Sequence, residues 1–165
     1  MIVKAFEFAK INLSKNKFFL LYGENSGFKD EIIKKIEKNF INNIFRYDEK
    51  EILENKENFL NGILSKSLFE NEKLIIISRT TDKIKTLIEE IIEKNVEDVT
   101  LIFIASLLDK KSKLRNLFEK DKKIICIAFY PDTHQTLNII TVNYFKKKKI
   151  SISQEMLNLL IERSR

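Results

Sequence analysis

The sequence SKSLFENEKLIIIS, residues 65–78, decides the fold class. Its second half contains residues 74–77, a continuous apolar run bounded by charged residues, which is typical of a strand buried on both faces of a parallel sheet. Its first half places two large apolar side chains, Leu68 and Phe69, beside a charged turn. These two residues either complete the core face of the preceding helix or project outward to contact a partner.

Apolar runs and helical patterns alternate along the chain on either side of this stretch. Strands are predicted at residues 18–22, 42–47, 74–77, 99–105 and 123–130. Helices are predicted between them, at residues 30–40, 50–66, 82–94 and 111–119. Because crossovers between parallel strands are right-handed, helices cover both faces of such a sheet. The sequence therefore predicts an α/β fold with a parallel five-stranded sheet and helices on both faces.

Pro131 is the single proline of the chain and follows the last predicted strand, so we expect a domain boundary there. Domain one would span residues 1–131, and the second would span residues 132–165. The second part has helical patterns at residues 133–149 and 153–163. Two helices with apolar faces cannot build an independent core, so we expect the truncated start of a small helical domain.

Composition limits the function classes. With 165 residues, 44% of them hydrophobic, the chain can bury one main core. Its net charge of +6 suits an anionic partner, although the charges are interspersed over helical faces. The lone Cys126 lies in an apolar run and the lone His134 has no cluster of ligands around it, so we expect no disulfide, metal or cofactor. Without a signal peptide or a run of about 20 apolar residues, the protein is expected to be soluble and cytoplasmic.

The loop after the first long strand resembles a phosphate-binding loop that has lost its key residues. The pattern G-x-x-x-x-G-K-[ST] lets backbone N–H groups surround the phosphates while the lysine and hydroxyl serve phosphate and Mg²⁺. Gly23 and Lys29 fit this pattern, but Phe28 replaces the second glycine and Asp30 replaces the hydroxyl residue. The strand at residues 74–77 also lacks a following acidic pair for Mg²⁺. We therefore expect neither ATP binding nor catalytic residues.

Three segments together resemble the delta subunit of bacterial DNA polymerase III, and the resemblance covers essentially the whole chain. They are LLYGE at residues 20–24, the turn Ser67, Leu68, Phe69 before an apolar strand, and LIFIA followed by LDKKSKL at residues 108–114. The last is the most specific. The resemblance implies an AAA+ fold with a degenerate P-loop, followed by the start of a helical lid domain.

The resemblance also implies a function. Delta subunits bind the ring-shaped sliding clamp, the beta subunit, and open it for loading onto primed DNA during chromosomal replication. They use a Leu-Phe pair that matches Leu68 and Phe69, in a turn that here includes Ser67. The chain would not be an enzyme by itself, although the holoenzyme is a nucleotidyltransferase. Its partners would be the clamp, the other clamp-loader subunits through a C-terminal collar absent from this sequence, and DNA indirectly, with no membrane partner.

Other interpretations stay open. The chain could be a P-loop nucleotide-binding protein, or a basic nucleic-acid-binding module that uses residues 146–149, Arg163 and Arg165. Ser112, Lys113 and Arg115 could form a positive edge near DNA, although a capped, solvated helix start explains them as well. Finally, apolar residues recur every four positions through Leu68, a periodicity that favours a core position for it.

Overall fold

The computed structural model describes residues 2–12, 15–40, 43–64, 72–94, 96, 98–121 and 124–163. The chain divides into two compact units, Met1–Phe129 and Tyr130–Arg165. The first is an α/β unit and the second is helical. That the helical unit begins a lid domain stays a prediction.

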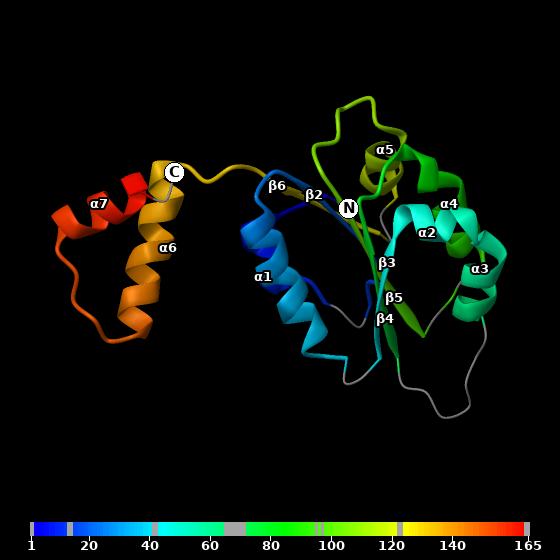
Figure 1. Ribbon diagram of the computed structural model, residues 1–165, viewed down its shortest axis with the longest axis horizontal. Helices are drawn as coiled ribbons and strands as arrows, with labels where there is room; N and C mark the ends of the chain where they lie inside the picture. The colour runs from blue at the N-terminus through cyan, green and yellow to red at the C-terminus, as the bar shows by residue number, and fades with distance from the viewer. Residues whose placement is uncertain are drawn as a thin grey trace. The chain divides into compact units, whose positions relative to one another are not determined.

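The α/β unit is built on a six-stranded parallel sheet with strand order β1-β6-β2-β5-β4-β3 (Figure 1). The strands are β1 (Ile2–Lys4), β2 (Phe18–Gly23), β3 (Ile44–Asp48), β4 (Lys73–Ser78), β5 (Val99–Ala105) and β6 (Ile125–Phe129). The prediction of a parallel α/β sheet is confirmed, but the count of five strands was one too few. A three-residue strand such as β1 is too short to show a period in the sequence.

Helices connect successive strands, as the sequence predicted. They are η1 (Ala5–Lys10), α1 (Ser26–Glu37), α2 (Glu49–Glu54), α3 (Lys56–Leu64), η2 (Asp82–Ile84), α4 (Lys85–Glu93) and α5 (Lys113–Lys120). The single helix predicted at residues 50–66 is two helices, because the backbone leaves the helical region at Asn55, where φ is −131°. In the described part of the chain, no helix is long and apolar enough to cross a membrane.

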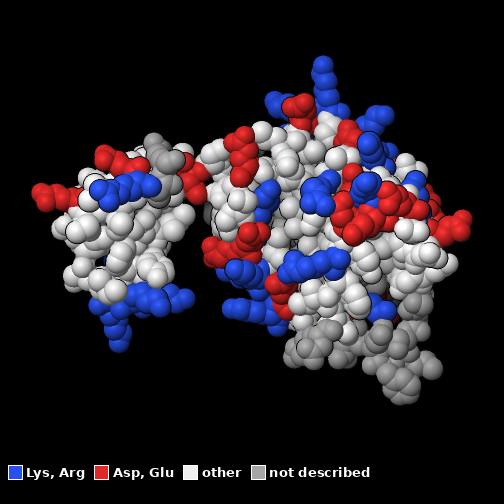
Figure 2. All heavy atoms as spheres, in the orientation of Figure 1, with Lys and Arg blue, Asp and Glu red and all other residues white. Residues whose placement is uncertain are grey.

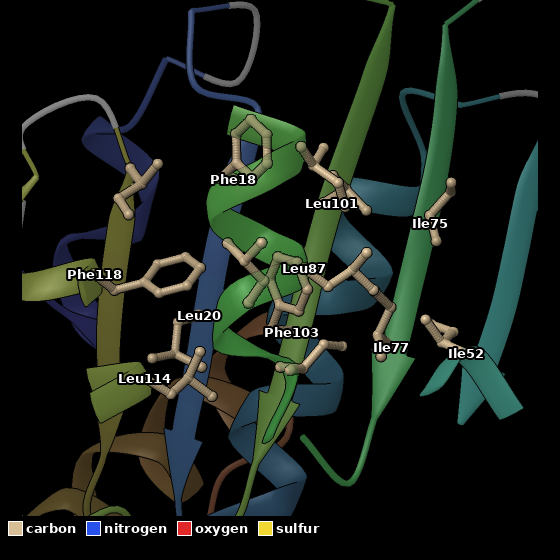
Figure 3. Packing of buried hydrophobic residues seen from close by; sticks show 14 of the residues in the cluster. Phe18, Leu20, Ile52, Ile75, Ile77, Leu87, Leu101, Phe103, Leu114 and Phe118 are labelled. Carbon is tan, nitrogen blue, oxygen red and sulfur yellow. The ribbon is translucent and has the colours of Figure 1, made fainter. Parts of the chain in front are cut away.

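Helices cover both faces of the sheet, so the core has two layers. Figure 1 shows α1 on one face and α2, α3 and α4 on the other. On the α1 face, Phe19 and Leu21 of β2 pack with residues of α1. On the opposite face, Leu20 of β2 packs with Phe103 of β5 and Phe118 of α5 (Figure 3). Every residue of β2 is buried, which explains its unbroken apolar sequence.

Cys126 of β6 lies in this core, as the sequence predicted. Burial raises the pKa of its thiol to about 12, because the thiolate would lose its hydration in an apolar environment. Since the thiolate is the nucleophile, we expect Cys126 to be unreactive at neutral pH.

The second unit is a pair of helices, α6 (His134–Lys147) and α7 (Gln154–Arg163). Thr133 caps α6 by accepting a hydrogen bond from the backbone N–H of Thr136. No residue of α6 is buried, and α7 buries only Leu157 and Ile161. Large apolar side chains therefore remain exposed in this unit: Tyr130, Ile139, Ile140, Tyr144, Ile150, Met156, Leu159 and Leu160.

Candidate functional site

The predicted phosphate loop joins the carboxyl end of β2 to the start of α1, between the neighbouring strands β5 and β6. Gly23 opens the loop with φ of +124°, and its backbone N–H donates to the carbonyl of Ser106 over 3.1 Å. A Cβ atom on Gly23 would lie 2.1 Å from the carbonyl oxygen of Phe129. Both observations require glycine, so the close approach of β6 explains this residue without any phosphate.

Most backbone N–H groups of the loop bond to acceptors within the protein. Those of Glu24 and Asn25 donate to the carbonyl oxygen of Phe129, over 3.0 and 3.4 Å. That of Ser26 donates to the carbonyl of Glu24, and that of Phe28 donates to Oδ1 of Asn25, which caps α1. A phosphate-binding loop turns such groups toward its ligand. Here the loop is closed on itself.

Lys29 points into the protein. Its Nζ lies 2.8 Å from the carbonyl oxygen of Gly23 and 3.1 Å from that of Ala105, and the residue is only 7% exposed. Burial lowers the pKa of Lys29, and the nearby Asp30 carboxylate opposes that shift. The ammonium group therefore ties the end of β2 to the end of β5, instead of reaching out for a phosphate.

The two residues that break the phosphate-binding pattern lie in different environments. Phe28 is half-buried, and its ring meets that of Phe129 edge to face, with 5.6 Å between the centroids. Asp30 is exposed on α1. At the end of β4, where an acidic pair would hold Mg²⁺, the chain has Ser78 and Arg79. Among the described residues, no group of acids, histidines or cysteines could hold a metal ion.

A second cluster, at the carboxyl ends of β4 and β5, was not found from the sequence. Asp82 accepts hydrogen bonds from the hydroxyl of Ser112 (2.6 Å) and from the backbone N–H groups of Lys113 (3.0 Å) and Leu114 (2.9 Å). The hydrogen bond from Ser112 has the largest effect on the pKa of Asp82 and lowers it. The hydrogen bonds from the backbone lower this pKa further. Asp82 thus caps α5 from 30 residues away, and no local pattern shows such a contact.

Ser112, Lys113 and Arg115, which were proposed as a positive edge, instead donate hydrogen bonds within this cluster. Ser112 is buried and caps α5 by accepting from the backbone N–H of Arg115 over 3.1 Å. Arg115 lies over the ring of Tyr22 and donates to Glu119 and to the carbonyl of Leu108. Most of the LDKKSKL motif therefore fixes the start of α5 against the sheet.

The sequence matches the family model for the DNA polymerase III delta subunit over residues 19–128, which is the sheet from β2 to β6. The chain belongs to the DNA polymerase III delta subunit family. The matched region contains both the closed phosphate loop and the cluster around Asp82. A search of curated proteins gave no significant match.

Solved structures agree with this fold. The DNA clamp loader delta protein of Bacillus subtilis (YqeN) matches with a TM-score of 0.67 and 16% identity, over 95% of this chain and 51% of that one. The chain thus spans about half the length of that delta protein. The AMPPCP-bound DnaA of Aquifex aeolicus matches with a TM-score of 0.52 and 15% identity, over 94% and 53% of the two chains. The α/β unit therefore has an AAA+-like fold.

The turn with Ser67, Leu68 and Phe69, for which the sequence predicts a clamp contact, lies outside the described residues, so this contact stays a prediction. The preceding helix, α3, buries Phe59 and Ile63, whereas Leu64 is 38% exposed. The stripe of leucines that would place Leu68 in the core therefore reaches the surface at Leu64.

The basic residues proposed to bind nucleic acid lie at helix ends in the delta-family chain. Lys146 and Lys147 form the last turn of α6, and Lys148 is its C-cap. Lys149 follows with φ of +59°, and the backbone N–H of Ile150 donates to the carbonyl of Phe145, which closes the helix end. Cations stabilise a helix at this end, which accounts for the cluster. Arg163 ends α7, and Arg165 lies outside the described residues.

Proposed function

We propose that this chain is the part of a clamp-loader delta subunit that binds the sliding clamp and opens its ring, without binding or hydrolysing ATP itself. The observation that carries the proposal is a delta-family fold whose phosphate loop is occupied by the protein's own groups. Lys29 and the N–H groups of Glu24, Asn25, Ser26 and Phe28 already have partners, so a triphosphate would have to displace them. The subunit would act by binding, as part of a larger clamp-loader assembly on DNA.

The clamp contact that we propose is the turn with Ser67, Leu68 and Phe69. It follows α3, whose leucine stripe is already exposed at Leu64, and it precedes β4 in a family whose members use a Leu-Phe pair at this position. Each apolar side chain that enters a clamp pocket would contribute about 1.5 to 3 kcal/mol of binding free energy. The pair would therefore be the hot spot of the interface.

The deciding experiment measures clamp affinity and thermal stability on the same variants. We expect Leu68→Ala/Phe69→Ala to weaken binding of the cognate clamp by about 2 kcal/mol or more, roughly thirtyfold, with little change in melting temperature. Leu107→Ala is the matched control, because Leu107 is 65% exposed in the loop after β5. A double variant with a much lower melting temperature would place the pair in the core. A double variant that binds the clamp with unchanged affinity would contradict the proposed contact.

Nucleotide binding gives a separate test. We expect ATP with Mg²⁺ to show no saturable binding in calorimetry at about millimolar concentration, because Lys29 and most N–H groups of the loop are already paired within the protein. The basic-module alternative predicts a salt-dependent affinity for DNA. A magnesium-dependent, saturable ATP site would contradict the proposal and favour the P-loop alternative.

A further inference from the structure

An ion pair between Lys17 and Glu72 joins two segments that are 55 residues apart in the sequence. The Nζ atom of Lys17 lies 2.8 Å from a carboxylate oxygen of Glu72. The side chain of Lys17 is only 17% exposed, whereas that of Glu72 is 54% exposed. Because one partner is largely shielded from water, this pair is screened less than a pair in which both side chains are exposed.

The sheet holds Lys17 in place. Lys17 comes directly before β2, and its carbonyl oxygen accepts a hydrogen bond from the backbone N–H of Leu101 in β5 over 2.7 Å. β2 lies between β5 and β6, and every one of its residues is buried. The backbone at Lys17 is therefore fixed, so its half-buried side chain is an anchor for the residue with which it pairs.

Glu72 lies outside the sheet, between the proposed clamp-binding turn and β4. It comes three residues after Phe69 and directly before β4. The start of β4 has a backbone anchor of its own, because the N–H of Lys73 donates to the carbonyl of Asp98 over 2.9 Å. The ion pair with Lys17 therefore acts on the chain just outside the strand, on the side of the turn.

The helix before the turn is also anchored. It is α3, and its Ile63 is only 4% exposed in the core of the α/β unit. Residues 65–71 connect this helix to Glu72. Fixing both ends of a segment limits the conformations that are open to it, so less conformational entropy is lost when a partner orders the segment.

We infer that Lys17 is a positioning residue for the proposed clamp contact. By holding Glu72, it limits the conformations of the segment with Leu68 and Phe69 before the clamp binds, and the clamp then binds more tightly. Lys17 acts through Glu72 and makes no contact of its own with the clamp. The inference rests on the proposed function, and it adds a residue that lies 50 positions or more before the turn in the sequence.

A change in overall charge would not have this effect. Figure 2 shows Lys, Arg, Asp and Glu side chains interspersed over the face of the α/β unit that is in view. The chain has a net charge of +6, so the loss of one positive charge changes its long-range attraction to a partner only slightly. Lys35→Met is the matched control, because Lys35 forms an ion pair of the same length, 2.8 Å, with Glu31 on α1.

The test measures the affinity of the full chain for the cognate clamp and its melting temperature. We expect Lys17→Met and Glu72→Gln each to weaken clamp binding by about three- to tenfold, with little change in melting temperature. Lys17→Met/Glu72→Gln should bind no more weakly than either single variant, because both changes remove the same interaction. Lys17→Glu/Glu72→Lys restores a pair of opposite charges and should bind within about twofold of the wild type, as should Lys35→Met.

The outcomes separate the inference from the proposed function. Unchanged affinity in Lys17→Met and Glu72→Gln would overturn the inference, as would an exchanged pair that binds as weakly as the single variants. A melting temperature that falls in step with affinity would give the ion pair a purely structural role and would also overturn it. If Leu68→Ala/Phe69→Ala weakens clamp binding and the Lys17 and Glu72 variants do not, only the inference fails. If Leu68→Ala/Phe69→Ala binds with unchanged affinity, the proposed contact fails and the inference fails with it.

Discussion

Gly23 and Lys29 of the phosphate loop have structural roles in this protein. Position 23 needs glycine because the carbonyl of Phe129 occupies the space of a side chain. The ammonium group of Lys29 joins two strand ends. Identity at these positions therefore gives no evidence of nucleotide binding, and the sequence alone could not distinguish a lysine that points outward from one that points inward.

Lys29→Met should lower the free energy of unfolding by about 1 to 3 kcal/mol at pH 7, because the carbonyls of Gly23 and Ala105 lose a buried donor. Urea unfolding measures this loss. Asp30→Ala, at the next and exposed position, should change stability by less than about 0.5 kcal/mol. A lysine kept only for phosphate would leave the stability of the unliganded protein unchanged.

The same variant has a pH dependence of known sign. Burial lowers the pKa of Lys29 in the folded protein below its ordinary value of 10.5. At pH values between the folded and the unfolded pKa of Lys29, the unfolded chain binds more protons than the folded protein. This residue therefore makes the free energy of unfolding rise with pH. The stability of the wild type relative to Lys29→Met should therefore increase as the pH approaches 10.5. A constant difference between pH 7 and pH 10 would contradict the assignment.

At the scale of elements, local patterns located most of the fold. Long apolar runs located β2, β4, β5 and β6, and helical periodicity located the helices between them. The sequence did not reveal the break at Asn55 between α2 and α3, because the apolar pattern continues across it. It also did not reveal the bond from Ser112 to Asp82, since this contact forms only when η2 and the start of α5 come together in the folded protein. The proposed site residues could be found because they lie in local sequence motifs. The residues that they contact lie far away in the sequence, so no local pattern reveals them.

Asp82 should make the protein more sensitive to acid. Its pKa is lowered in the folded state, so its stabilising contribution is present above about 3.8 and is lost as the pH falls through the lower folded value. The stability of the wild type relative to Asp82→Asn should therefore decrease below pH 4 in acid titrations followed by circular dichroism.

Ser112→Ala is the companion variant. It should cost about 1 kcal/mol at pH 7 and reduce this acid sensitivity, because it removes both the cap of α5 and the main bond to Asp82. Equal acid sensitivity in the wild type and both variants would show that the cluster does not control it.

At the scale of the whole molecule, the two units bury very different amounts of apolar surface. Every residue of β2 is buried, whereas α6 buries none and α7 buries two. Hydrophobic burial is the main source of stability, so the helical unit should open more readily than the sheet. We expect amides of α6 and α7 to exchange at least about 100-fold faster than those of β2 and β5, a difference of roughly 3 kcal/mol. Hydrogen exchange of the full chain measures this, and equal protection across Pro131 would contradict it.

The position of β2 in the sheet has a consequence for synthesis of the protein. Tyr22 pairs with Ala105 of β5 on one side and with Ala128 of β6 on the other. The strand β2 is therefore synthesised long before both of the strands with which it pairs. At a translation rate of about 5 to 20 residues per second, the delay before β6 emerges is roughly 5 to 20 s. During that time the apolar sequence FFLLY is exposed at the ribosome, where it is a natural target for chaperones that bind nascent chains.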